Sequence, residues 1–198
     1  MVDSILKNVF GDGSVWFWGM AQAIIVGATG FLIYRQIRLA RYANMLDTLD
    51  RLDSKWRSLE LIRARHDICN VFEKGDADNK KITFREAHVL DFFEDMGLFL
   101  RRGVLDGETV WESYSYSIEH YWQLTEPRIT EFRTATKDRT WYTNFEYLFQ
   151  KIAKTSSKKR CVSGKTQEEL RKFAIGEMDR LQKTQNDRIS EVGEILLD

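Results

Sequence analysis

Two groups of basic side chains carry the clearest chemical signal in this sequence. The larger group lies in residues 151–165, a stretch with six basic residues and no acid, and the smaller one follows a predicted helix. The candidate anion contacts are Lys158, Lys159, Arg160, Arg101 and Arg102. Clustered cations attract phosphate-bearing partners, so these residues predict binding of anionic lipid headgroups, a nucleotide or an oligonucleotide.

A second pattern lies in residues 15–34, which contain no side chain charged at neutral pH. Small residues recur every four positions, a spacing that lets two helix backbones approach closely in lipid. Polar residues recur every seven positions and need a partner there, either a neighbouring helix or water in a narrow pore. The candidate helix-contact or pore-facing residues are Gly19, Gln22, Ala23, Gly27 and Thr29.

Several familiar motifs are incomplete. Ile33 stands where a dinucleotide-binding fingerprint needs its third glycine, and no alternation of strands and helices follows. Residues 76–81 lack the central glycine of a calcium loop. The three histidines, His66, His88 and His120, have no companions at metal-ligand spacing. We therefore predict no catalytic residue, no metal, no cofactor and no enzymatic activity.

Residues 15–34 also have the length of a membrane span. At about 1.5 Å per residue this stretch covers roughly 30 Å, the thickness of the hydrocarbon core of a bilayer. Aromatic residues stand at both ends, as in interfacial belts. Arg35, Arg38 and Arg41 follow directly, so the positive-inside rule places the N-terminus outside and the rest in the cytoplasm. We expect a single-pass membrane protein with most of its chain in the cytoplasm.

The sequence after the span is low in proline and glycine and predicts an all-α fold, with the membrane helix continuing into a cytoplasmic helical bundle. The expected parts are an external amphipathic segment at 1–14, the membrane helix at 15–34, a cytoplasmic helical domain at 35–153, a basic loop at 154–166 and a C-terminal amphipathic helix at 167–198.

Local signals place the ends of these helices. No proline or glycine occurs between Phe31 and Gly75, which favours one helix running from the membrane into the bundle. Thr83 with Glu86, and Thr166 with Glu169, have the spacing of capping boxes. Asp106 is a candidate cap for a helix rich in aromatic residues. Pro127 is expected to open a further helix, since proline suits a first turn.

The aromatic-rich middle of the chain has two readings. Trp111, Tyr114, Tyr121, Trp122 and Trp141 fall at helical spacing, which favours a buried core. The basic residues between the aromatic segments are Arg128, Arg133, Lys137 and Arg139. Such residues beside exposed rings could instead hold phosphates while the rings stack on bases.

The residues 92–129, FFEDMGLFLRRGVLDGETVWESYSYSIEHYWQLTEPRI, with TNFEYLFQ downstream, resemble an uncharacterised domain-of-unknown-function family of small bacterial and phage-associated membrane proteins. The resemblance covers roughly residues 15–153. It implies one N-terminal membrane helix and a helical cytoplasmic domain, and it supplies no catalytic residues. The layout is also similar to membrane effectors of bacterial antiphage systems, whose soluble domain senses a signal while clustered membrane helices permeabilise the envelope.

Three functions follow from these observations. The favoured one is a homo-oligomeric membrane effector of at least about four subunits, because one helix per chain needs several copies to enclose a water-filled path. It would form a pore or disrupt the membrane when a ligand or partner binds the helical domain, in antiphage defence. Its partners would be membrane lipid, copies of itself, and a nucleotide or oligonucleotide signal or a regulatory protein. The alternatives are a passive membrane-tethered scaffold and, last, a membrane-held enzyme.

Overall fold

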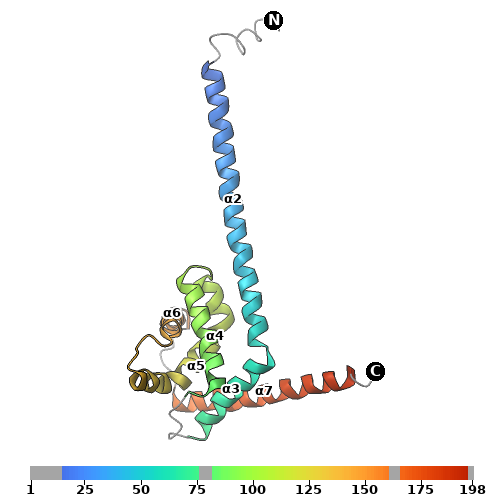
Figure 1. Ribbon diagram of the computed structural model, residues 1–198, viewed down its shortest axis with the longest axis vertical. Helices are drawn as coiled ribbons and strands as arrows, with labels where there is room; N and C mark the ends of the chain where they lie inside the picture. The colour runs from blue at the N-terminus through green and yellow to red at the C-terminus, as the bar shows by residue number, and fades with distance from the viewer. Residues whose placement is uncertain (1–14, 76–81, 161–165, 196–198) are drawn as a thin grey trace. The chain divides into compact units, whose positions relative to one another are not determined.

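The computed structural model describes residues 15–75, 82–160 and 166–195 (Figure 1). The described part holds six helices and no strand, which confirms the all-α prediction. The expected external segment at 1–14 and the calcium-like loop at 76–81 lie outside the described residues. The chain divides into two units, Met1–Leu46 and Asp47–Asp198, which are described one at a time.

The first unit consists, in its described part, of most of helix α2 (Val15–Trp56). Its apolar side chains are largely exposed, and Ile24, Val26 and Phe31 are each more than 60% exposed. Within α2 lies one stretch that is long and apolar enough to cross a membrane. The sequence thus builds a helix whose residues 16–34 are mostly apolar and exposed, with Gln22 and Thr29 as polar interruptions.

The second unit begins with the last turns of α2 and continues through five further helices. These are α3 (Leu59–Glu73), α4 (Phe84–Arg101), α5 (Gly107–Thr136), α6 (Thr143–Arg160) and α7 (Gln167–Ile195). Helix α4 packs on α6 and α3, α5 packs on α6, and α7 packs on α3. The result is a bundle in which each helix buries one face.

The helix that begins in the first unit ends at Trp56, so the prediction of one helix up to Gly75 is wrong. Ser58 has an extended backbone, and its hydroxyl accepts a hydrogen bond from the Leu61 amide at 3.2 Å. A serine that caps the next helix in this way competes with continuing the previous one. The break therefore needs neither proline nor glycine.

The other predicted caps are confirmed. Thr83 and Glu86 form a reciprocal capping box at the start of α4. The Asp106 carboxylate accepts hydrogen bonds from the first amides of α5. At the start of α7, the Thr166 amide donates to Glu169 and the Glu169 amide donates back to the Thr166 hydroxyl. These local rules fix where three of the helices begin.

Two expectations about helix ends are wrong. Pro127 does not open a helix but lies inside α5, where it removes a single backbone hydrogen bond while buried neighbours on both sides keep the helix in place. The expected basic loop is helical over residues 154–160, because α6 continues to Arg160. Ile152 and Ser156 bury one face of this last stretch, so packing keeps it helical despite its basic composition. Residues 161–165 lie outside the described part.

An aromatic cluster forms the centre of the bundle. Trp56, at the end of α2, meets Phe92 and Phe93 of α4, with ring centroids 4.9 and 5.5 Å apart. Phe93 stacks on Phe145 of α6 at 4.7 Å and contacts Tyr121 of α5. Four of these rings are completely buried. Most of the predicted aromatic positions therefore belong to the core, whereas Trp141 stays 44% exposed.

Candidate functional site

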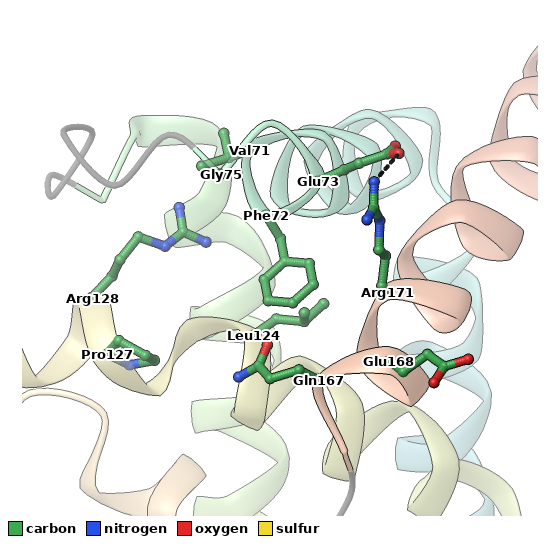
Figure 2. Close-up of a pocket in the computed structure, with 10 residues that line it drawn as sticks. All are labelled: Val71, Phe72, Glu73, Gly75, Leu124, Pro127, Arg128, Gln167, Glu168 and Arg171. Carbon is green, nitrogen blue, oxygen red and sulfur yellow. Dashed lines mark ion pairs between the residues drawn. The ribbon is translucent and has the colours of Figure 1, made fainter.

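A pocket of about 660 Å³ opens between α3, α5 and α7 (Figure 2). It forms where the end of α3, the middle of α5 and the first turns of α7 meet. Its lining residues are Val71, Phe72, Glu73, Gly75, Leu124, Pro127, Arg128, Gln167, Glu168 and Arg171. This volume is typical of sites for small molecules or for an inserted side chain of a partner protein.

The floor of the pocket is apolar and its rim is charged. Phe72 and Leu124 lie next to each other in the middle of the lining, and Pro127 lies nearer to Arg128 (Figure 2). On one side of the rim Arg128 pairs with the buried carboxylate of Glu86. An occupant with an apolar body would therefore fit the floor.

On the other side of the rim, Arg171 lies 3.9 Å from Glu73 (Figure 2). Glu168 also lines the rim, so two arginines face two glutamates and the lining has no net charge. An electrically balanced lining suits an occupant without net charge. In this respect the pocket differs from an anion site.

A buried polar network holds α7 in place beside this pocket. Glu177 of α7 accepts hydrogen bonds from Arg65 of α3 at 3.3 Å and from Tyr121 of α5 at 3.0 Å, and it also pairs with Arg180. Burial raises the pKa of Tyr121 well above its usual range and lowers the pKa of Arg65. Arg65 and Glu177 are each about 95% buried, so the pair is sealed from water.

The same arginine holds the end of α2. Its Nη2 donates to the Trp56 carbonyl at 3.1 Å, and its guanidinium lies 4.0 Å from the centre of the Trp56 ring. A helix end leaves carbonyl groups without intrahelical partners, and Arg65 supplies one. Arg65 thus links the end of α2 to both α3 and α7.

This network was missed at the level of sequence, although a signal was present. Arg65 lies four residues after Leu61 and three before Ile68, on the apolar face of α3. Glu177 lies four residues after Phe173 and four before Leu181, on the buried face of α7. An opposite charge on each of two apolar faces indicates a buried pair, because an isolated buried charge is too costly.

The predicted anion contacts around residue 159 have partners of their own. Lys159 pairs with Glu108 of α5, and its ammonium lies 4.1 Å from the centre of the Trp111 ring. Lys158 is exposed to solvent, and the side chain of Arg160 lies outside the described part. Of the three predicted contacts here, Lys158 is therefore exposed and has no ion pair within the described ranges, whereas Lys159 is paired.

The second predicted group lies at the opposite end of α6. Arg101 donates to the Asn144 side chain at 3.0 Å and stacks on Tyr147, with 4.8 Å to the ring centre. Arg102 is exposed at the end of α4. Asn144 and Lys158 are separated by about 21 Å along the helix axis. The two basic groups do not form one site.

The membrane-helix candidates all lie on α2. Gln22, Ala23 and Thr29 are exposed, and a Cβ added at Gly19 or Gly27 would meet nothing within 4 Å. Both the small-residue face and the polar stripe are thus open along the described part of this helix.

The histidines take part in local packing. His88 lies 3.2 Å from a Glu60 oxygen, and His120 stacks on Phe173 at 4.2 Å between ring centres. Among the residues that the structure describes, no three potential metal-ligating side chains gather in one place.

Comparison with protein families gave one result. A family described as a domain of unknown function, DUF4760, matches residues 20–152, which include the apolar helix and the bundle through most of α6. Comparisons with curated proteins and with solved structures each found no match. Because the match covers more than half of the chain, the protein belongs to the DUF4760 family.

Proposed function

We propose that this protein is a membrane-anchored effector that assembles into homo-oligomers and permeabilises the bilayer when its helical bundle binds a ligand or partner. The single observation that carries the proposal is α2: an apolar helix exposed on all sides and attached to a well-packed bundle that contains a ligand-sized pocket. The exposed apolar surface would lie in lipid, and the bundle would remain in water.

Assembly follows from the small and polar faces of α2. In lipid, the open backbone at Gly19 and Gly27 gains little from acyl chains but packs closely against a second helix. Gln22 needs a hydrogen-bond partner in the membrane, which a neighbouring subunit or enclosed water would supply. At least about four copies would surround a water-filled path. Polar residues would then line the path and small residues the helix contacts.

Gating would start at the pocket between α3, α5 and α7. An occupant that changes the spacing of these helices would act on the Arg65–Glu177 pair, which joins α3 to α7. Arg65 also holds Trp56 at the end of α2. A change at the pocket therefore has a defined route of contacts to the end of the helix that would cross the membrane.

Orientation and location complete the proposal. Arg35, Arg38 and Arg41 follow the apolar stretch and favour a cytoplasmic bundle under the positive-inside rule. The proposed location is the bacterial inner membrane, and the proposed role is antiphage defence, on the similarity of layout to membrane effectors of such systems.

The test is membrane permeability in bacteria that express the full chain, measured by dye entry and loss of membrane potential. Ala23→Leu and Ala28→Leu form a matched pair, because Ala28 lies about 140° around the helix from the centre of the small-residue face. We expect permeability from the wild type and from Ala28→Leu, and its loss in Ala23→Leu and Gly27→Leu at equal membrane levels. Equal behaviour of the two alanine variants would contradict assembly through that face.

Cross-linking in intact membranes separates a closed oligomer from a monomer. A ladder reaching four or more subunits in the wild type, shortened in Ala23→Leu, supports assembly even where the resting state is closed. Monomers in both would rule out the oligomeric effector.

A passive membrane-tethered scaffold is the second candidate. Exposed aromatic residues on the bundle favour it: Phe84 is 82% exposed, Tyr116 56% and Trp141 44%. Such rings are common in surfaces that bind other proteins. A scaffold would leave the membrane sealed and would capture the same bacterial partner with either alanine variant.

A further inference from the structure

A second pocket, of about 630 Å³, lies at the corner where α5 ends and α6 begins. It differs from the pocket of Figure 2 in chemistry, because its lining is polar and carries an excess of positive charge. Its lining residues are Thr130, Arg133, Thr134, Lys137, Arg139 and Glu146. Three cations face one acid.

The one acid in the lining is already paired. Arg133 Nη1 donates to Glu146 at 2.8 Å, and Arg133 Nε donates to the Trp141 carbonyl at 2.8 Å. Lys137 and Arg139 are exposed and form no ion pair with any residue in the described ranges. Two full positive charges are therefore left over beside the pocket.

Asp138, the acid between Lys137 and Arg139 in the sequence, is bound to Thr140 and not to either cation. The Asp138 carboxylate accepts hydrogen bonds from the Thr140 amide at 2.8 Å and from the Thr140 hydroxyl at 2.7 Å. These bonds lower the pKa of Asp138. Asp138 is thus used to shape the turn between Lys137 and Arg139, whose side chains both line the pocket.

The backbone at Lys137 gives an independent indication. Lys137 ends α5 in the left-handed conformation, with φ at 55°. Glycine takes this position in many helices because a Cβ is unfavourable there. A lysine at such a position accepts backbone strain and places an ammonium group at the pocket. Strain of this kind is often found at ligand sites.

Arg133 adds a further donor without a partner. Its Nη2 is buried and makes no hydrogen bond within the described part of the chain. A buried donor lacking an acceptor is unfavourable, but this atom is closed to solvent, so the parts of Arg133 that line the pocket, and not Nη2, would face a ligand.

We propose that this corner between α5 and α6 is a binding site for a phosphate-bearing ligand, held by Lys137, Arg139 and Arg133. The volume lies within the range of small-molecule sites and exceeds the size of one phosphate group. The charge excess calls for a ligand with two or more negative charges, as in a pyrophosphate or a phosphomonoester. Neither Lys158 nor Arg101 lines this pocket, and the inference does not rest on the proposed membrane function.

The test uses the full chain in nanodiscs of neutral phosphatidylcholine and measures binding of inorganic pyrophosphate and of ATP by calorimetry. Lys137→Gly removes a cation while relieving the backbone strain, so the folded bundle is retained or stabilised. Arg139→Gln removes the second free cation from an exposed position. Lys158→Gln is the matched control, since it removes an exposed lysine from the other basic group.

We expect pyrophosphate to bind the wild type and Lys158→Gln equally. We expect each of Lys137→Gly and Arg139→Gln to weaken binding by at least about tenfold, with unchanged or higher thermal midpoints. The assignment would be overturned if the wild type did not bind pyrophosphate. It would also be overturned by unchanged binding in the variant that combines Lys137→Gly with Arg139→Gln, or by an equal loss of binding in Lys158→Gln.

A second arm identifies the source of the phosphate. In nanodiscs that contain phosphatidylglycerol, a lipid headgroup at this site would compete with pyrophosphate and lower its apparent affinity in the wild type. An unchanged affinity would assign the site to a soluble phosphorylated compound. Either result is compatible with the site, and each selects one of its two possible ligands.

Discussion

Ile24 and Ile68 are both isoleucines, but they lie on different helices. Ile24 is 63% exposed, whereas Ile68 is completely buried. Ile24 belongs to the first unit, in which apolar side chains surround the helix. Ile68 belongs to the second unit, in which each helix presents one apolar face to its neighbours. The apolar side chains of the described first unit are therefore largely exposed, whereas those of the bundle are buried against one another.

The largest effect is expected from charges placed in the exposed helix. Ile24→Arg combined with Ile25→Arg should oppose membrane insertion by roughly 6–8 kcal/mol, because each central arginine costs about 3 kcal/mol and each isoleucine lost about 0.5 kcal/mol. The measurement is the fraction of protein that stays with membranes after an alkaline carbonate wash. Phe84→Arg is the control, since Phe84 is 82% exposed on the bundle. Equal retention of both variants would show that exposure of α2 has no relation to lipid.

The next effect concerns the bundle alone. Glu177→Ala should lower the free energy of unfolding by about 3–5 kcal/mol, because it leaves Arg65 buried without its carboxylate. Urea unfolding of the full chain in detergent measures this loss, and membrane association should not change. Glu168→Ala, at an exposed ion pair with Lys172, should stay within about 0.5 kcal/mol of the wild type. A small effect of Glu177→Ala would mean that water reaches Arg65.

Two glycines compare a closely packed position with an open one inside the second unit. A Cβ on Gly97 of α4 would lie 2.5 Å from the Asn144 carbonyl carbon of α6, and closer still to the oxygen. Gly97→Ala should therefore push α4 from α6 and cost about 3 kcal/mol of unfolding free energy. Gly176→Ala, where the added Cβ meets nothing within 4 Å, should instead stabilise α7 by about 0.5–1 kcal/mol. Chemical denaturation of both variants measures the contrast, and a gain in Gly97→Ala would refute the close approach.

The smallest effect is on the pH dependence of the bundle. Burial raises the pKa of the Cys69 thiol to about 12, and Glu177 adds to the rise. A pKa that is higher in the folded state gives stability that is present below the unfolded thiol pKa of about 8.5 and is lost as pH rises toward 12. Between these two pKa values, ionisation of Cys69 should lower the free energy of unfolding by up to about 1.4 kcal/mol for each pH unit.

Cys69→Ala should reduce the loss of stability with rising pH. It should not abolish that loss, because buried Tyr121 also has a raised pKa. Unfolding free energies at pH 8, 9 and 10 in a Cys161→Ser background measure the change. The same background tests reactivity, because maleimide should label Cys69 only when the bundle unfolds. Rapid labelling of the folded protein would contradict the burial of this thiol.

Local patterns predicted much of the fold. The spacing of Thr83 and Glu86, and the carboxylate at Asp106, placed helix starts correctly because capping depends on a few neighbouring residues. Ser58 and Pro127 were misjudged because their outcome depends on packing with distant segments. Ser58 can cap α3 because α3 packs on the rest of the bundle. Pro127 stays inside α5 because tertiary contacts on both sides hold that helix together.

Sites were harder to predict than helices. Adjacent cations such as Lys158 and Lys159 are easily recognised in a sequence. In the structure, however, Lys159 already pairs with Glu108 and lies over the Trp111 ring. The cations of the α5–α6 corner were recognised only as basic residues among aromatic ones, because the turn that brings Lys137 and Arg139 to a common pocket is a property of the backbone. Local spacing places Arg65 and Glu177 each on an apolar face, but it does not show that these two residues, 112 positions apart, pair with each other.

That separation has a consequence for the order in which the protein is made. During translation Arg65 emerges well before Glu177, with 112 residues still to be added. At about 5–20 residues per second the ribosome needs roughly 6–22 s to supply the missing carboxylate. In this interval α2 has already left the ribosome, while α3 must wait with an unmatched charge on its apolar face. Closure of the bundle around Arg65 therefore waits for α7, which brings the carboxylate of Glu177 to the buried guanidinium.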